Sequence, residues 1–324
     1  MKLILGGWLF LLLAAPSPGE AQTTNPPPPP SAADQQYRFS VSVQMVVLQA
    51  TVLTTKGSFV KGLRQHNFQV YEDDRQQTVG LFRHSDDPVA IGLIVDNSGS
   101  MRRKHSAVLA AAKAFARNSN PKDELFVVSF SEQVQLGLPR KQLFSGNSRE
   151  LERALPSTAA GGKTALYDAL ETGLSHVHQL KQDKKALILI SDGGDNASSH
   201  TLEQVMSDAT NSDVVIYTIG LFGKYEEETN PAFMKQIAYV TGGEAFLPAR
   251  PGQAANNCKR IAQTIRNEYT VGYSPSNPEP SGKFRAIRLH VTTARQGKVV
   301  VRTRIGYTPQ NSAAQGNSDK EAVR

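Results

Sequence analysis

The sequence predicts an α/β fold: a doubly wound parallel sheet inserted in a small β-sandwich-like module built from the N- and C-terminal flanks. Between residues 87 and 268, apolar runs of strand length alternate with segments that carry apolar residues at helical spacing. On either side, at 37–86 and 269–308, the pattern is of short β-strands. Neither flank has enough strands for a stable sheet, and the two ends of an inserted domain tend to lie close together. We therefore expect the flanks to pair with each other.

The first residues of the chain are expected to lie outside this fold. Residues 1–21 combine Lys2, the apolar run 3–13 and then small residues and proline, which is typical of a secretory signal peptide. The apolar run is too short to span a bilayer comfortably. Residues 22–36 contain five consecutive prolines at 26–30, which favour an extended linker. We expect an exported protein, periplasmic or extracellular, with no transmembrane segment after cleavage.

Strand candidates on the flanks are short and are separated by turn residues. Within residues 37–53 the apolar alternation changes phase near Val46, which favours a bulge or a strand that changes partners. A polar, disordered tail is expected at 309–324. The flanking strands are predicted at 37–53, 68–72, 77–83, 269–273, 285–293 and 298–305.

The central region has the strand–helix alternation of a parallel sheet. Val89–Val95 and Ala186–Ile190 carry no charge, as expected of strands buried on both faces. Leu166, Leu170 and Leu174 recur at helical spacing. Strands are predicted at 89–95, 125–130, 186–190, 214–221 and 244–248, and helices at 104–118, 149–155, 164–179, 201–210, 231–240 and 254–267.

Polar side chains begin where the first central strand ends. Asp96, Ser98 and Ser100 occupy alternate positions, and Gly99 lets the backbone bend between them. The loop after the carboxyl end of a strand is where ligands bind in an open α/β sheet. One carboxylate and two hydroxyls suit a hard cation such as Mg²⁺ or Ca²⁺ rather than Zn²⁺. Asp, Ser and Gly also form ordinary turns and helix caps, so the motif gains its meaning from the buried strand before it.

Two later segments supply further oxygen ligands. Thr164 follows two glycines at the start of a predicted helix, and Asp192 follows the second apolar strand. Neighbouring parallel strands would bring Asp192 beside the Asp96 loop, because parallel strands end at the same edge of a sheet.

Together these residues resemble the metal-ion-dependent adhesion site of the von Willebrand factor type A (VWA) domain. The resemblance lies in five residues that occur in the same order as in that motif: Asp96, Ser98, Ser100, Thr164 and Asp192. Wider similarity, including the run Thr-Ala-Leu-Tyr-Asp-Ala-Leu at 164–170, resembles the bacterial VWFA-related family of acidobacterial type over roughly residues 37–308.

The resemblance implies that these five side chains hold a divalent cation, Mg²⁺ or alternatively Mn²⁺ or Ca²⁺. A cation held by few carboxylates stays electrophilic and keeps a position for an outside anion. The resemblance implies that this anion is an Asp or Glu side chain of a partner protein. The predicted function is therefore non-enzymatic protein binding, with adhesion or interaction through the ion.

Two other hypotheses use the same ion. A metal-dependent hydrolase, of the phosphoester type, would need a general base or a second metal near Asp96, and only Asp195 is an obvious candidate. The alternative interpretation is that Asp195 is an ordinary turn residue. In the second hypothesis the ion is purely structural and no partner binds to it.

Several other features have simpler interpretations. The net charge of +7 favours acidic partners. Nucleic-acid binding is not indicated, because no platform of basic and aromatic residues accompanies this charge. Residues 102–104, Arg-Arg-Lys, are interpreted as a solvated surface run, with a basic rim around the acidic-ligand site as the alternative. His176 and His178 are expected at the surface, and the single cysteine, Cys258, is expected to be buried and inert.

Overall fold

The computed structural model of the protein describes residues 45–84, 86–157, 159–223, 228–277, 282–293 and 297–309. All of them belong to one compact unit, Val43–Arg324. The predicted signal peptide, the proline-rich linker, the start of the first strand at 37–44 and the tail from residue 310 lie outside the described residues.

The central sheet has six strands in the order β10-β9-β8-β5-β6-β7. All neighbouring pairs are parallel except β6 and β7, so the predicted parallel α/β sheet is confirmed. The antiparallel edge strand β7 escaped prediction because it is short and half exposed, with no buried apolar pattern. The strands are β5 (Val89–Asp96), β6 (Glu124–Phe130), β7 (Val134–Leu136), β8 (Lys184–Ser191), β9 (Val215–Gly220) and β10 (Ala245–Phe246).

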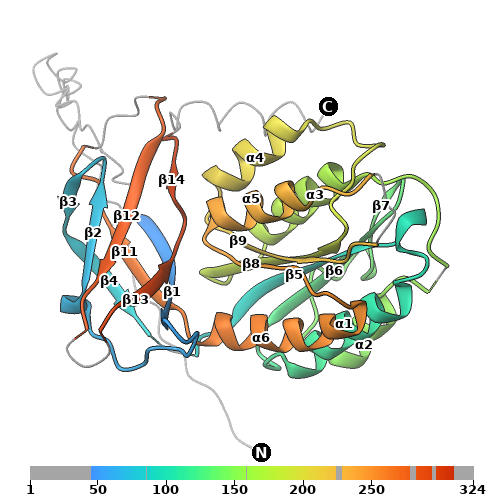
Figure 1. The fold of residues 1–324 in the computed structure, drawn as a ribbon, viewed down its shortest axis with the longest axis horizontal. Helices are drawn as coiled ribbons and strands as arrows, with labels where there is room; N and C mark the ends of the chain where they lie inside the picture. The colour runs from blue at the N-terminus through green and yellow to red at the C-terminus, as the bar shows by residue number, and fades with distance from the viewer. Residues whose placement is uncertain are drawn as a thin grey trace, which may run out of the picture. The chain divides into compact units, whose positions relative to one another are not determined.

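Helices cover both faces of this sheet, as a doubly wound fold requires (Figure 1). One face carries α3 (Leu166–His178), α4 (Leu202–Asn211) and α5 (Pro231–Thr241). The other carries α1 (His105–Asn118), α2 (Ser148–Ala154) and α6 (Ala254–Arg266). Short 3₁₀ turns are η1 (Gln65–Asn67), η2 (Gly99–Met101) and η3 (Pro251–Gln253).

The two flanks pair with each other, as predicted, and build two antiparallel sheets. Their orders are β13-β1-β11-β4 and β14-β12-β2-β3. Each sheet therefore combines strands from before and after the central domain. The strands are β1 (Val46–Thr54), β2 (Phe68–Glu72), β3 (Arg75–Gln77), β4 (Val79–Arg83), β11 (Tyr269–Tyr273), β12 (Arg285–Val291), β13 (Val299–Arg302) and β14 (Gly306–Tyr307).

The flanking strands differ from the prediction in three places. β1 does change partners, but between Ala50 and Thr51, where pairing passes from β11 to β13, rather than near Val46. The predicted strand 77–83 is divided between β3 and β4, which lie in different sheets. The predicted strand 298–305 ends early: β13 stops at Arg302, and β14, which lies in the other sheet, begins at Gly306, beyond the predicted range. A chain that crosses from one sheet to the other keeps its β-type composition, so the pattern alone did not show the crossing.

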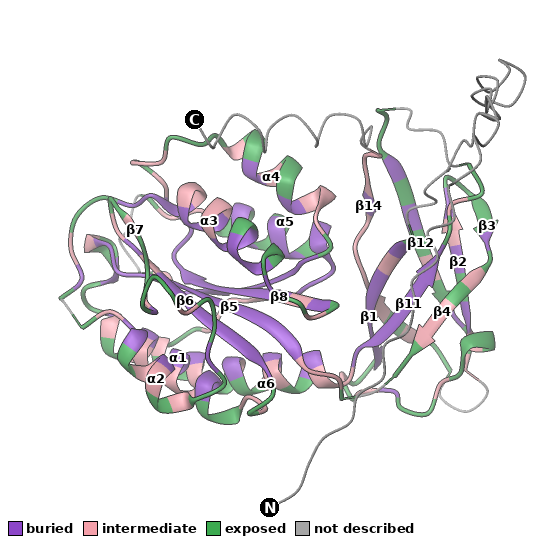
Figure 2. Ribbon diagram, turned by 180° about the vertical axis from the view of Figure 1, so that it is seen from behind, coloured by how far each residue is buried: buried purple, intermediate pink, exposed green. Residues whose placement is uncertain are grey.

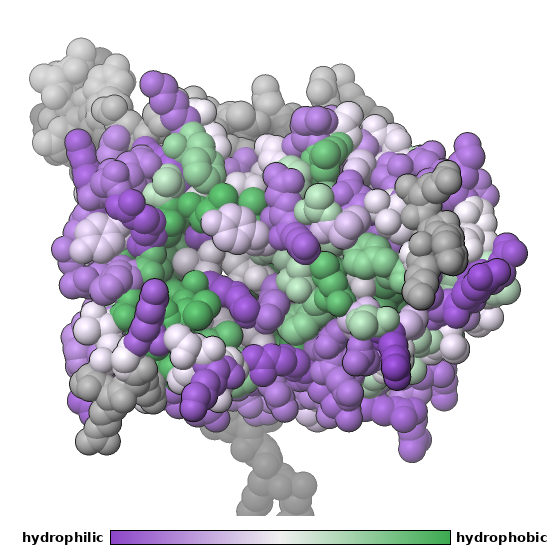
Figure 3. Space-filling view, in the orientation of Figure 1, coloured by the Kyte–Doolittle hydropathy of each residue, from purple (hydrophilic) through white to green (hydrophobic). Residues whose placement is uncertain are grey.

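Apolar side chains form one core in each part of the described chain. The larger core lies on both faces of the central sheet, where every residue of β5 is buried, and the smaller one lies between the flanking sheets (Figure 2). Cys258 belongs to the larger core, and burial raises the pKa of its thiol to about 12, so the expectation of a buried, inert cysteine is confirmed. On the face in Figure 3, hydrophobic areas lie over both the flanking sheets and the central domain, surrounded by hydrophilic side chains.

Candidate functional site

The candidate site begins at the carboxyl end of β5. Asp96 is the last residue of this strand and its side chain is buried. Its Oδ1 accepts a hydrogen bond from the Ser98 backbone N–H at 2.9 Å, and its Oδ2 accepts one from the Ser191 hydroxyl at 2.6 Å. Because β8 is the parallel neighbour of β5, the end of β8 carries this hydroxyl to the same edge of the sheet. Both strands therefore fix the Asp96 carboxylate.

The two serines of the motif lie together in the loop that follows. The hydroxyl oxygens of Ser98 and Ser100 are 3.1 Å apart. The Gly99 backbone N–H donates to the Gly162 carbonyl at 3.0 Å, and a Cβ on Gly99 would come within 3.2 Å of that oxygen. Gly162 itself has φ of +80°, in the left-handed region that glycine tolerates best. The two glycines let the loop after β5 lie directly against the loop before Thr164.

Thr164 is held in place from the opposite side. Its backbone N–H donates to Asn196 Oδ1 at 2.8 Å, and its carbonyl accepts from the backbone N–H groups of Asn196 at 2.9 Å and Ala197 at 3.1 Å. These contacts come from the loop after β8, the same loop that begins with Asp192. The hydrogen bonds therefore tie all three loops of the predicted site together.

Asp192 is the second buried carboxylate of the site. Its Oδ1 accepts from the Gly194 backbone N–H at 3.3 Å, and its Oδ2 lies 3.3 Å from the ammonium nitrogen of Lys104. Lys104 is itself buried, and its Nζ also donates to the Leu221 carbonyl at 2.8 Å. The interpretation of residues 102–104 as a solvated run is therefore wrong for Lys104. It holds for Arg102 and Arg103, which are exposed.

Electrostatics show that the two carboxylates influence each other. Burial raises the pKa of Asp96 to about 6, the hydrogen bonds from Ser191 and Ser98 lower it, and the negative charge of Asp192 raises it. A positive charge between or beside the two groups would relieve both the burial cost and the repulsion.

Asp195, the candidate base of the hydrolase hypothesis, has a structural role in the chain as described. Its Oδ1 accepts from the backbone N–H groups of Leu166 at 2.8 Å and Tyr167 at 3.2 Å, at the start of α3. The Ser198 hydroxyl donates to the same oxygen. Asp195 thus satisfies helix N–H groups that have no partner within the helix.

Asp168 performs a similar task that sequence reasoning missed. Its carboxylate accepts from the backbone N–H groups of Ser199 and His200, at 3.0 and 2.9 Å to its nearer oxygens, and these hydrogen bonds lower its pKa. The loop after β8 is therefore fastened to α3 at two aspartates, Asp168 and Asp195. A carboxylate in the first turn of a helix was the available signal, but it does not reveal the partner.

The prediction that both histidines of α3 lie at the surface is wrong for His176. Its side chain is buried, its ring centroid is 4.4 Å from that of Phe126, and its Nε2 lies 2.7 Å from the Leu143 carbonyl. The segment that carries Leu143 covers this part of the helix, which the spacing of histidines could not show. His178 is partly exposed and contacts Asp213, as a surface residue can.

The donor set decides which metals the five residues could hold. Two carboxylates and three hydroxyls offer only oxygen, which fits Mg²⁺, Mn²⁺ or Ca²⁺. Among the residues that the structure describes, no group of three or more His, Cys, Asp and Glu side chains could hold a metal ion.

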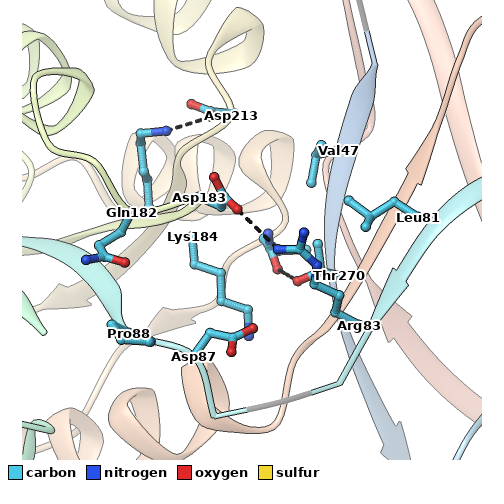
Figure 4. A pocket seen from close by; sticks show the side chains of 12 residues that line it. Val47, Leu81, Arg83, Asp87, Pro88, Gln182, Asp183, Lys184, Asp213 and Thr270 are labelled. Carbon is cyan, nitrogen blue, oxygen red and sulfur yellow. Dashed lines mark hydrogen bonds and ion pairs between the residues drawn. The ribbon is translucent and has the colours of Figure 1, made fainter. Parts of the chain in front are cut away.

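One cavity lies away from these loops. It measures about 590 Å³ and is lined largely by residues of β1, β4 and the start of β8. Figure 4 shows Arg83 directed toward Asp183, and their ion pair measures 3.2 Å. Lys185 and Asp213 form a second pair there at 3.0 Å. These charges therefore pair with one another within the cavity.

The class of domain follows from the fold, the loops and a family comparison together. The model of the von Willebrand factor type A domain matches residues 91–194, a range that contains all five candidate ligands. The chain therefore contains a von Willebrand factor type A domain, built on the predicted parallel sheet.

Similarity to individual proteins is more distant. Calcium-activated chloride channel regulator 1 of the horse, Equus caballus, is 25% identical over 170 residues, which cover 51% of this chain and only 17% of that protein. A solved von Willebrand factor type A structure from Catenulispora acidiphila is 14% identical with a TM-score of 0.48, covering 76% of this chain and 75% of that one. The manganese-loaded TRAP protein of Plasmodium vivax is 14% identical with a TM-score of 0.44, covering 74% and 98%.

Proposed function

We propose that the protein is an exported, non-enzymatic binding protein that engages an acidic side chain of a partner protein through a divalent cation. The cation is Mg²⁺, or alternatively Mn²⁺ or Ca²⁺, and its ligands are Asp96, Ser98, Ser100, Thr164 and Asp192. One observation carries the proposal: hydrogen bonds between Gly99 and Gly162 and between Thr164 and Asn196 hold three loops together at one edge of the sheet. This arrangement supplies two buried carboxylates and three hydroxyls from distant parts of the sequence.

The chemistry of this donor set favours binding over hydrolysis. When bound, the cation supplies an electrophilic centre, since only two of its protein ligands carry a negative charge. A phosphoester hydrolase would also need a general base placed to activate water. Asp195 is the candidate that the sequence suggests, and the backbone N–H groups of Leu166 and Tyr167 hold its Oδ1 at the start of α3. The chain's residues therefore support recognition of an anionic group more than its chemical conversion.

Export is the second part of the proposal. It rests on the signal-type composition of residues 1–21. Among the described residues, no helix is both long and apolar enough to cross a bilayer. Intact-mass measurement of protein isolated from its native compartment should give an N-terminus at or near Gln22. Mature protein that retains Met1 or Lys2 would contradict export.

Metal binding is tested by calorimetric titration of Mg²⁺, Mn²⁺ and Ca²⁺ into the wild type and Asp96→Ala. We expect one ion to bind the wild type and none to bind the variant detectably, because the variant lacks a charged ligand. Circular dichroism should show that the variant stays folded, since Asp96 ends a strand and its ionised form is costly to bury. The control is Asp183→Ala, which removes a carboxylate that is 80% exposed and should leave the affinity unchanged.

The outcome of this titration decides the proposal. Equal uptake by the wild type and Asp96→Ala, or no uptake by either, would contradict it. Partner binding is tested separately by affinity capture from cell-envelope extract, in which any captured protein should be lost with chelator and with Asp96→Ala alike. A partner that survives both treatments would show that recognition does not pass through the ion.

A further inference from the structure

Lys104 occupies an unusual position for a lysine beside a proposed cation site. It follows the turn η2 and precedes α1, and its backbone N–H donates to the Met101 carbonyl at 2.9 Å. Its side chain is only 5% exposed, and its ammonium nitrogen lies 3.3 Å from Asp192 Oδ2 and 2.8 Å from the Leu221 carbonyl oxygen. A buried ammonium is tolerated only where it is paired and hydrogen-bonded, and both acceptors contribute to this.

Among the described residues of these loops, three buried side chains carry a charge: Asp96, Asp192 and Lys104. Asp96 and Asp192 are both buried, and their negative charges repel each other. Lys104 adds one positive charge on the side of Asp192, so the three ionised side chains sum to −1. A divalent cation would bring the sum to +1, and one carboxylate from a partner would bring it to zero. Without the lysine, the cation alone would neutralise the two aspartates.

We propose that Lys104 is a built-in counter-ion, a positioning residue that holds Asp192 when no metal is bound, weakens binding of the metal alone, and couples metal binding to binding of a carboxylate. This inference rests on the proposed function and deepens it. Lysine suits the task because its ammonium is a single point charge on a flexible stem, which can leave one acceptor and keep another. The Leu221 carbonyl is one acceptor that the ammonium can keep.

The first test is titration of Mn²⁺ alone, in chloride buffer, into the wild type, Lys104→Met and Arg103→Met. Lys104→Met keeps the length of the side chain and removes the charge, and its Mn²⁺ affinity should rise about tenfold or more. Repulsion between a unit charge and a divalent ion a few ångströms apart is worth that much even at a water-like dielectric constant. Arg103→Met removes an exposed charge from the adjacent residue, and solvent screening should hold its effect below about threefold.

The second test measures thermal unfolding in chelator and in saturating Mn²⁺. In chelator, Lys104→Met leaves the buried Asp192 without its counter-ion, so its Tm should fall by about 5 °C or more. Mn²⁺ should raise the Tm of the variant more than that of the wild type, because the metal replaces the missing charge. If Lys104→Met does not fold, Lys104→Gln keeps an N–H donor for the Leu221 carbonyl without the charge and is tested in the same way.

The third test addresses the coupling to a carboxylate. Mn²⁺ titration is repeated with acetate in place of chloride at equal ionic strength. Acetate should tighten Mn²⁺ binding more in the wild type than in Lys104→Met, because only the wild type carries the surplus positive charge. An acetate effect that is no larger in the wild type would overturn the coupling.

The results separate this inference from the proposal on which it rests. If the wild type binds Mn²⁺, Asp96→Ala does not, and Lys104→Met binds no more tightly than the wild type, the proposed function stands and the role of Lys104 is wrong. If Lys104→Met binds Mn²⁺ and the wild type does not, Lys104 opposes the metal as inferred, but the proposed function of the wild-type chain is refuted. If none of the proteins binds Mn²⁺, both the metal site and the role of Lys104 are refuted.

Discussion

Two buried ion pairs in this protein have nearly the same exposure and very different surroundings. In the flanking sheets, Arg285 and Glu72 are each 5% exposed and lie 3.0 Å apart. At the edge of the central sheet, Lys104 and Asp192 are 5% and 2% exposed and lie 3.3 Å apart. Both pairs place a cation against a carboxylate out of reach of water.

The remaining partners of the two carboxylates differ. Glu72 Oε2 accepts from the hydroxyls of Tyr273 at 2.6 Å and Tyr307 at 3.1 Å. Burial and the nearby Glu72 raise the pKa of both tyrosines, that of Tyr307 to about 12, so both remain donors at neutral pH. All these residues lie on strands. Asp192 lies in a loop, and its Oδ1 accepts from the Gly194 backbone N–H at a long 3.3 Å.

The comparison shows that a buried ion pair can either stabilise the fold or be displaced by an incoming ion. Glu72 is saturated by short hydrogen bonds from rigid strands, and its cation is an arginine, whose planar fork suits fixed geometry. Asp192 has long contacts from a loop and from a flexible lysine. We expect the first pair to hold the flanking sheets together and the second to give way to an incoming ion.

The largest expected effect is that of Glu72→Ala. It leaves the buried guanidinium of Arg285 without its carboxylate, and loss of one partner of such a pair costs about 3–5 kcal/mol of unfolding free energy. The loss should be the same with and without Mn²⁺, measured by urea unfolding. Asp74→Ala serves as the control, because its pair with Arg288 is 78% and 69% exposed and should contribute little. If Mn²⁺ restored the unfolding free energy that Glu72→Ala loses, the two ion pairs would not differ in the way described.

A third buried carboxylate, Glu268, sharpens the comparison because it titrates near neutrality. It directly precedes β11, accepts a hydrogen bond from Tyr217 on β9, and has its pKa raised to about 7 by burial, against the lowering effects of Lys184 and Tyr217. The unfolded chain releases this proton near pH 4.5, so the folded state holds it more tightly. The resulting stability is fully present below about pH 4.5 and is lost as the pH rises through 7.

We expect this loss to amount to about 3 kcal/mol, and Glu268→Gln to abolish it. Urea unfolding at intervals from pH 5 to 8 should show the wild type losing stability relative to the variant across this range. Parallel curves for the two proteins would mean that Glu268 does not titrate in this window. Mn²⁺ should not alter the difference, since Glu268 is not among the proposed ligands.

The smallest effect is expected for Thr164→Ala, which removes one neutral oxygen from the proposed metal site. Mn²⁺ affinity should fall by about tenfold or less, consistent with a single neutral ligand. Unfolding free energy in chelator should change by less than about 1 kcal/mol, because the backbone hydrogen bonds of Thr164 remain. Thr164→Ser keeps the hydroxyl and is the matched control. If Thr164→Ser lost as much Mn²⁺ affinity as Thr164→Ala, the Thr164 hydroxyl would not be a metal ligand.

Features that depend on neighbouring residues were predictable. The charge-free run of β5 indicated a strand buried on both faces, because burial on both faces leaves no place for a polar side chain. The helical stripe from Leu166 to Leu174 indicated α3. The placement of Asp96 and Asp192 after parallel neighbours implied that their loops meet, since parallel strands end at one edge.

Sequence patterns were thus enough to predict the α/β class and to expect the flanks to pair, and the five candidate ligands stay a prediction. Three contacts became visible in the packed fold alone: Lys104 is buried against Asp192, the segment of Leu143 covers His176, and Asp195 caps α3. The physical reason is the range of the interactions. Periodicity and turn chemistry act over a few residues, whereas the partner of a charge is chosen by which distant elements the packed core brings together. A lysine that follows two arginines in the sequence is expected to be solvated. The fold instead brings a carboxylate, 88 residues away in the chain, within hydrogen-bonding distance of its ammonium.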